Sequence, residues 1–164
     1  MTSSVAAIEP VRRSIEIEVP AAEAFAIYTQ EIASWWVKEH HIGKTPFVDV
    51  VMEPRVGGRY YEVSADGTEC DWGKVLVWEP PLRVVTSWHL GGDWKFHPEL
   101  EKASEVEVRF VPLGEMATRI ELEHRHFERH DGGEVVAAGV GSPGGWGKTL
   151  EGIRASAEAR KVSK

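Results

Sequence analysis

The sequence predicts an α+β domain in which a curved antiparallel β-sheet grips one long α-helix. In the middle of the chain, short stretches of alternating apolar and polar residues are separated by turns rich in glycine and proline, which is typical of strands joined by hairpins. Two short helical stretches follow the first strand, and one long amphipathic stretch ends the sequence. An antiparallel sheet has to bury its apolar face, and the last helix is the obvious cover.

The N-terminal part of the domain predicts one strand and two short helices. Residues 11–19 alternate apolar with polar or charged side chains, and Pro20 ends this strand. Residues 21–36 carry apolar side chains at helical spacing, with a break near the polar pair QE. Because Trp35 and Trp36 are adjacent on a short helix, we expect one of them to be exposed.

Six further strands are predicted in hairpin succession. Their residues are rich in Val, Tyr and Trp, and turn sequences such as PRVGG and ADGT separate them. The predicted strands are residues 47–54, 57–64, 70–80, 82–90, 104–112 and 116–127. In the last two strands, alternation places these side chains on the inner face: Val106, Val108, Phe110, Ile120, Leu122 and His124.

The last predicted helix, residues 143–160, follows a segment similar to a phosphate-binding loop. GSPGGWGKTL contains Gly147 and Lys148 followed by Thr149, the second half of the Walker pattern. The first glycine of that pattern is replaced by Ser142, and hairpin-linked strands do not form the βαβ unit that such a loop requires. We therefore expect Ser142 to be the N-cap of an ordinary helix. The core-facing stripe of this helix is Trp146, Leu150, Ile153 and Ala157.

Bulk composition indicates one domain spanning residues 1–164, with a flexible start over residues 1–10. The chain is 42% hydrophobic and 27% charged, and its net charge is −7. An acidic chain without a basic stripe is not expected to bind nucleic acid, and no apolar run is long enough to insert into a membrane. Cys70 is the single cysteine and no signal peptide is visible, so we expect a cytosolic protein.

Four segments carry a resemblance to a known family. They are VPAAEAFAIYTQEIASWW, PRVGGRYYEVSADGTECDWGKVLVWEPPLRVVTSWHL, SEVEVRFVPLGEMATRIELEHRHFE and GGWGKTLEGI. In this order they resemble the activator-of-heat-shock-ATPase homologue family, within the START and birch-pollen-allergen-like superfamily. The resemblance covers about residues 11–160 and implies a helix-grip fold with an internal cavity beneath the long helix.

The resemblance also implies a range of functions. Members of the superfamily bind lipids, sterols, polyketides and other apolar ligands in the cavity, and some of them catalyse reactions on these ligands. Eukaryotic namesakes carry a separate chaperone-binding domain, for which this chain has no room. The family has no universal catalytic residues, so the resemblance assigns none here.

Aromatic side chains are the main candidates for lining such a cavity. A small-molecule site is usually apolar with a few polar groups, and the seven tryptophans provide large apolar surfaces. The alternative is that these aromatics simply fill a core, since each buries about 150–250 Å². The predicted ligand-binding residues are Trp36, Trp72, Thr86, Trp88, Trp94, Phe96, Leu122, His124, Trp146 and Leu150.

The segment EHRHFERH raises the question of a metal site. It places His124 and His126 at strand spacing, followed by Glu128 and His130. Three converging protein ligands are usually needed for zinc, so we expect neither a metal nor another cofactor. His124 is instead expected to be the polar group of the pocket, able to orient a hydroxyl or carboxylate of the ligand.

No catalytic residue is predicted from the sequence. Cys70 has no recognisable base beside it, and a lone cysteine is usually inert. Alternation can place most of the acidic side chains of the middle strands on the outside. These residues are Asp49, Glu53, Glu62, Glu69 and Asp71.

Three functions remain open at this stage. The leading hypothesis is a protein that binds a small apolar or aromatic ligand in an internal cavity. The second is an enzyme that acts on a cyclic or aromatic substrate there and uses His124. The third is an interaction module, either linked to a chaperone or forming a homodimer through an exposed Trp35 or Trp36.

Overall fold

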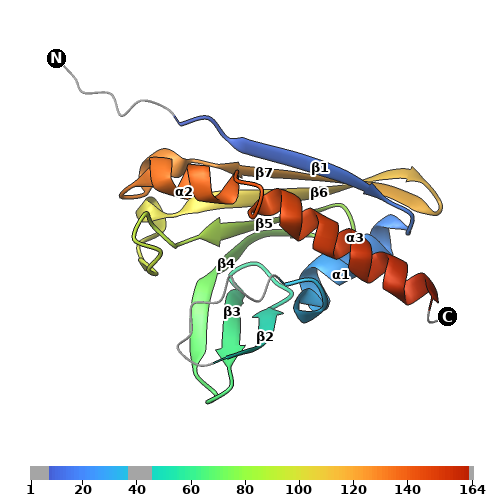
Figure 1. Cartoon of the computed structure of the whole chain (residues 1–164), viewed down its shortest axis with the longest axis horizontal. Helices are drawn as coiled ribbons and strands as arrows, with labels where there is room; N and C mark the ends of the chain where they lie inside the picture. Colours follow the sequence, from blue (N-terminus) through green and yellow to red (C-terminus); the bar gives the residue numbers. More distant parts are fainter. Residues whose placement is uncertain (1–7, 37–45, 163–164) are drawn as a thin grey trace.

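One seven-stranded antiparallel β-sheet curls around the helices, as Figure 1 shows. The computed structural model describes residues 8–36 and 46–162. Successive strands from β2 to β7 are neighbours, and β1 pairs with β7, so the order is β1-β7-β6-β5-β4-β3-β2. The strands are β1 (Val11–Ile17), β2 (Phe47–Met52), β3 (Arg59–Ser64), β4 (Glu69–Glu79), β5 (Arg83–Trp88), β6 (Ser104–Gly114) and β7 (Ala117–Arg125). The antiparallel helix-grip fold expected from the sequence is confirmed.

The helices lie on the concave side of this sheet. Helix α3 crosses it obliquely and contacts β1 and α1, whereas α2 lies in front of β6 and β7 (Figure 1). None of the described helices is long and apolar enough to cross a bilayer. The helices are α1 (Ala21–Gln30), α2 (Gly133–Val140) and α3 (Trp146–Val162), with short 3₁₀ turns η1 (Ile32–Ser34), η3 (Leu100–Lys102) and η4 (Phe127–Arg129).

Helix α2 is absent from the sequence prediction, because EVVAAGV has the composition of a strand. Val136 and Val140 are one helical turn apart and both are buried, so the apolar residues face the core at a helical period. Gly132 precedes the helix with a φ of 72°. A Cβ on Gly133 would meet the carbonyl oxygen of Phe127 at 2.0 Å. Gly132 and Gly133, which suggest a loop in the sequence, therefore allow this helix to begin, because the first has a positive φ and the second has no room for a Cβ.

Helix α3 begins at Trp146, and the predicted start at Pro143 is wrong. The hydroxyl of Ser142 donates to the carbonyl of Gly139 at 2.6 Å, so it satisfies the end of α2 and does not cap α3. The glycine-rich segment thus joins two helices and lacks the strand that a phosphate-binding loop follows. The predicted apolar stripe is confirmed, and its buried members are Trp146, Leu150, Ile153 and Ala157.

The main core lies between α1, α3 and the inner face of the sheet. Phe110 of β6 is at its centre, with ring centroids 5.2 Å from Phe25 and 5.9 Å from Tyr28. Burial raises the pKa of the Tyr28 phenol, so this side chain stays neutral. The inner-face residues predicted in the last two strands are all buried: Val106, Val108, Phe110, Ile120, Leu122 and His124.

The outer face of β5, β6 and β7 carries charges, and Glu107 lies at its centre. Its carboxylate accepts hydrogen bonds from Nε of Arg83 at 2.6 Å, from Nε of Arg109 at 2.7 Å and from Arg125. Burial raises the pKa of Glu107, but the three guanidinium groups outweigh burial and bring this pKa down to about 2. Glu107 is therefore ionised at all ordinary pH values, and this face stays polar.

Strand β4 contains a β-bulge at Trp72. Tyr60 pairs with Gly73 and Tyr61 pairs with Asp71, which leaves Trp72 as an extra residue without a partner. A bulge redirects the side chain at this point and increases the local twist. The bulge therefore lies where the sheet bends, and it turns the indole of Trp72 into the interior.

The close approach of β4 to β5 beside this bulge gives a test of the fold. A Cβ on Gly73 would meet the carbonyl oxygen of Ser87 at 1.8 Å, so Gly73→Ala should lower the free energy of unfolding by about 2 kcal/mol or more. A Cβ on Gly147 of α3 would have no heavy atom within 4 Å, so Gly147→Ala should leave stability unchanged or raise it by up to about 1 kcal/mol. Urea denaturation measures both. Equal effects of the two substitutions would contradict this packing.

Candidate functional site

A continuous row of aromatic rings lines the inner face of the sheet. The centroid of Trp72 lies 5.2 Å from that of Trp36 and 5.3 Å from that of Trp88. Trp88 in turn lies 5.1 Å from the ring of His124 and 5.8 Å from Trp146. These five residues are called the aromatic row below. Four of them come from four separate elements, β4, β5, β7 and α3, and Trp36 lies just after η1, so the fold itself assembles the row.

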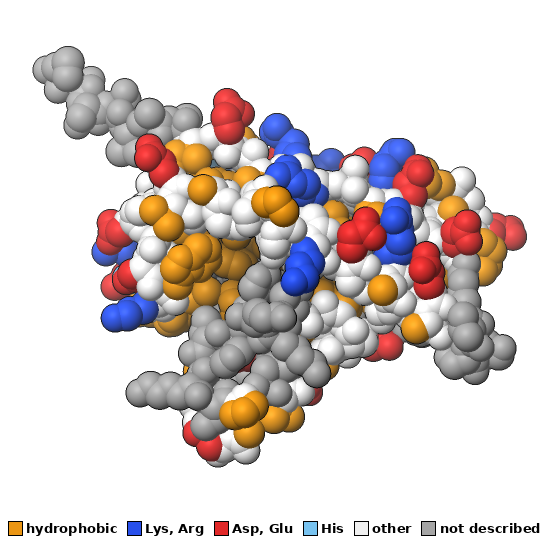
Figure 2. All heavy atoms as spheres, in the orientation of Figure 1, with side chains coloured by type: hydrophobic (Ala, Val, Ile, Leu, Met, Phe, Trp, Pro, Cys, Tyr) orange, Lys and Arg blue, Asp and Glu red, His pale blue; other side chains and the backbone are white. Residues whose placement is uncertain are grey.

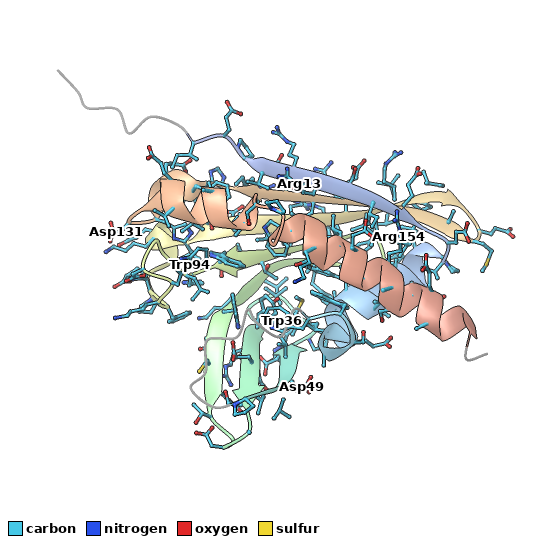
Figure 3. The ribbon with its side chains drawn as sticks, in the orientation of Figure 1. Arg13, Trp36, Asp49, Trp94, Asp131 and Arg154 are labelled. Carbon is cyan, nitrogen blue, oxygen red and sulfur yellow. The ribbon has the colours of Figure 1, made fainter. Side chains whose placement is uncertain are left out.

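The pairing of β5 with β6, the pairing of β6 with β7 and the start of α3 bring these rings together. Trp88 ends β5 opposite Ser104, the first residue of β6, and His124 of β7 lies opposite Val106 of β6. Trp146 reaches the same region from the first turn of α3. Figure 3 places Trp36 between α3 and the strands β2 to β4. The row therefore extends from the bent part of the sheet to the start of the long helix.

A buried carboxylate lies at one end of the row. Glu62 of β3 is fully buried, and its Oε1 accepts a hydrogen bond from Nε1 of Trp72 at 2.8 Å. Tyr60, two residues earlier, shares this inner face, and burial raises the pKa of its phenol, with a further increase from the Glu62 carboxylate. The expectation that alternation places the acidic side chains of the middle strands mostly on the outside is wrong for Glu62, because tyrosines stand on both faces of β3 and the alternation there is ambiguous. The structure turns Glu62 inward.

A buried imidazole network lies at the other end of the row. His124 is fully buried, and its Nδ1 accepts a hydrogen bond from Nε1 of Trp146 at 3.0 Å. The hydroxyl of Ser104 lies 2.7 Å from Nε2 of His124 and 2.7 Å from Nε2 of His130. The same alternation that places Val106 inward also places Ser104 inward, so the sequence carried a signal for this residue.

Both histidines of this network resist protonation. Burial lowers the pKa of His124 well below its ordinary value, and the nearby imidazole of His130 adds to this effect. Burial also lowers the pKa of His130 to about 4, assisted by His89 and His97. Both imidazoles are therefore neutral at pH 7, and each has one protonated and one bare nitrogen.

The remaining predicted site residues divide into two groups. Thr86, Leu122 and Leu150 are buried on the inner face or on the facing side of α3. Phe96 stacks on His89 with centroids 5.0 Å apart. His89 follows Trp88 and faces the other way, so Phe96 lies on the opposite side of β5 from the row.

Trp94 lies at the surface beside helix α2. It is 44% exposed and has a φ of 58°, and a Cβ on Gly139 would lie 2.8 Å from its indole. Figure 2 shows hydrophobic side chains gathered below α2, where Figure 3 labels Trp94. Neither Trp35 nor Trp36 is exposed, because Trp35 is buried against Tyr28 and Trp36 is half-buried against Trp72 of the row. The expectation of one exposed tryptophan at this pair is wrong.

The histidine-rich segment does not converge as a metal site. His126 has a φ of 69° and leaves the strand, and its Nδ1 lies 3.5 Å from an oxygen of Glu128 at the surface. It therefore does not share a strand face with His124, contrary to the prediction. Among the described residues, no three His, Cys, Asp or Glu side chains are arranged to hold a metal ion.

The fold and its aromatic interior define a helix-grip α+β domain, and comparisons identify the family within this class. Residues 18–158 match the family of the activator of Hsp90 ATPase homolog 1-like protein. The chain therefore belongs to this family, and the resemblance seen in the sequence is confirmed. No curated protein matches the chain in sequence.

Solved structures similar to this chain include two with informative names. An anthrahydroquino-gamma-pyrone synthase, Txn09, is 38% identical, with 92% of this chain and 97% of that chain covered and a TM-score of 0.65. CalC, a self-sacrificing resistance protein from Micromonospora echinospora, is 26% identical over 92% of this chain and 95% of its own, with a TM-score of 0.67. A protein from Nitrosomonas europaea, 16% identical over 93% of this chain and 96% of its own with a TM-score of 0.66, shares the fold.

The lowered pKa of His130 predicts how stability depends on pH. The unfolded chain binds a proton at His130 near pH 6.5, whereas the folded chain binds it only near pH 4. The folded state should therefore lose about 2–3 kcal/mol as the pH falls through this window, with a further loss in the same direction from His124. Urea denaturation between pH 7 and pH 4.5 measures this slope. His130→Gln should flatten it, and parallel curves for the two proteins would contradict the assignment.

Proposed function

We propose that this protein binds a flat, fused-ring aromatic molecule with hydroxyl or keto oxygens, between the inner face of its sheet and helix α3. The observation that carries this proposal is the aromatic row with an acid–base group at each end. Rings in such a row offer faces and edges on which another flat ring can stack. A largely apolar site with a few polar groups is the usual form of a small-molecule site.

The polar groups of the row suit oxygen atoms of the ligand. Trp72 and Trp146 each direct an indole N–H toward the interior, where it is paired with Glu62 or His124. A hydroxyl group can replace either member of such a pair, because it both donates and accepts hydrogen bonds. A purely aliphatic lipid has no groups that match these positions.

The similar proteins support an aromatic ligand. The name of the synthase that is 38% identical to this chain describes a fused-ring aromatic product. The match covers 92% of this chain and 97% of that chain. A fused-ring ligand is accordingly favoured over the wider set of apolar ligands.

The same likeness favours a second function, catalysis of ring closure on the ligand. When a phenol closes onto a 1,3-diketone to give a pyranone, the phenol oxygen bonds to a ketone carbon and one water is lost. A base removes the phenol proton, and an acid protonates the departing hydroxyl. In this interior His124 would remove the phenol proton, and a water molecule would protonate the departing hydroxyl, which is bonded to the same carbon as the phenol oxygen.

Binding is tested with alizarin, a dihydroxyanthraquinone, titrated into the protein while tryptophan fluorescence is followed. We expect saturable quenching with one site, and Trp88→Leu should weaken binding about tenfold, because the ring in the middle of the row is lost. Trp78→Phe is the matched control, since Trp78 packs on Phe25 with centroids 5.0 Å apart and lies outside the row. Equal affinities of the two variants, or no saturable quenching, would contradict the proposal.

Catalysis is tested with 1-(2-hydroxyphenyl)butane-1,3-dione, which closes to 2-methylchromone with loss of one water. We expect the protein to accelerate formation of the chromone, which is followed by its absorbance. His124→Gln should reduce the accelerated rate about a hundredfold, a usual effect of removing a general base. If neither the protein nor this variant changed the rate, this second function would be abandoned and binding would stand alone.

A further inference from the structure

We propose that Ser104 and His130 are positioning residues for His124, and that the three side chains form a directional proton path from the aromatic row to the loop after β7. This inference rests on the proposed role of His124 in the site. It assigns functions to two buried side chains outside the aromatic row, of which Ser104 meets the row at His124.

The direction of the path follows from one group whose chemistry is fixed. An indole N–H can only donate, so Nδ1 of His124 must be the bare, accepting nitrogen. Nε2 of this neutral imidazole therefore carries the hydrogen and donates to Oγ of Ser104. The Ser104 hydroxyl is then free to donate to Nε2 of His130, which places the hydrogen of His130 on Nδ1. Each group in the series has one donor and one acceptor role.

Burial makes this arrangement specific. Ser104 and His124 are fully buried, and His130 is 7% exposed, so water does not compete freely for these hydrogen bonds. Nδ1 of His130 is buried near the backbone carbonyl of Lys102 without a well-formed hydrogen bond among the described residues, and it is the last group of the series. The inner end is closed by Trp146 until a ligand hydroxyl takes the place of the indole N–H.

The groups around His130 keep it neutral and able to pass a proton on. Besides burial, the imidazoles of His89 and His97 disfavour a positive charge there, whereas the carbonyl of Lys102 and the carboxylate of Asp131 favour it. Burial is the largest of these effects, and the pKa of His130 is lowered overall. A proton that reaches His130 is therefore released and not retained.

Proton transfer along the path is balanced. Nδ1 of His124 accepts the hydroxyl proton of the ligand, and Nε2 gives its own proton to Ser104. The serine hydroxyl gives its proton to Nε2 of His130. Nδ1 of His130 is buried at rest, so it gives its proton to a water molecule that reaches it from the loop after β7. The ligand becomes an anion, one proton leaves the protein, and both imidazoles end as the opposite neutral tautomers. The protein itself gains no charge in the buried interior.

The tautomers can be measured directly in the ligand-free protein by ¹⁵N NMR of the histidine side chains, in which protonated and bare ring nitrogens differ widely in chemical shift. We expect the Nε2–H form for His124 and the Nδ1–H form for His130. Finding Nδ1–H on His124, or Nε2–H on His130, would overturn the proposal without any variant.

Substitution of Ser104 separates a positioning role from a merely structural one. In Ser104→Ala, His130 should lose its single tautomer and become a mixture, whereas Ser104→Thr, which keeps the hydroxyl, should restore the Nδ1–H form. His126→Gln is the control, because His126 is at the surface and outside the network. An unchanged His130 tautomer in a folded Ser104→Ala protein would contradict the proposal.

The path itself is tested with bound alizarin, which changes colour when it loses a phenol proton. We expect Ser104→Ala and His130→Gln to make deprotonation of the bound dye about tenfold less favourable, with little change in the affinity for the neutral dye. The same proton loss in wild type and in both variants would refute the path. If alizarin fails to bind, the proposed function fails, and the tautomer measurement still decides the positioning of His124.

Discussion

The hydrogen bond from Nε1 of Trp146 to Nδ1 of His124 is the constraint on which the interior depends. It joins the first turn of α3 to the inner face of β7 across 3.0 Å. A buried donor or acceptor that loses its partner costs about 1–3 kcal/mol, so both side chains hold the helix in this position. The same bond determines which nitrogen of His124 is bare, and it thereby links the packing of the fold to its chemistry.

The outer face of the sheet is charged, whereas the inner face is mostly aromatic with a few paired polar groups. On the outer face, Glu107 is held by three arginines, so its charge never enters the interior. On the inner face, the polar side chains Glu62 and His124 are each paired with an indole N–H, and the rest of the surface is aromatic. Polar groups in an otherwise apolar core reduce the stability of the fold, and such groups are typical of functional sites.

The sequence predicted what depends on regular periodicity and missed what depends on local breaks and distant partners. The strands around Val106 and the stripe of α3 follow simple periods, so they were predicted correctly. Helix α2 was missed because its valines suit a strand equally well. Glu62 was expected on the outside with the other acidic residues, and this was wrong because β3 has apolar residues on both faces. Ser104 meets His124 and His130 at separations of 20 and 26 residues, which only the sheet register and the η4 turn bring together.

A crystal structure of the protein with alizarin tests the central claim, that the aromatic row is a binding surface for a flat aromatic molecule. The account predicts dye density stacked along Trp72 and Trp88 beneath α3, with a phenol oxygen within hydrogen-bond distance of Nδ1 of His124. Dye bound only beside the exposed Trp94, with the interior filled by side chains of the protein, would contradict it.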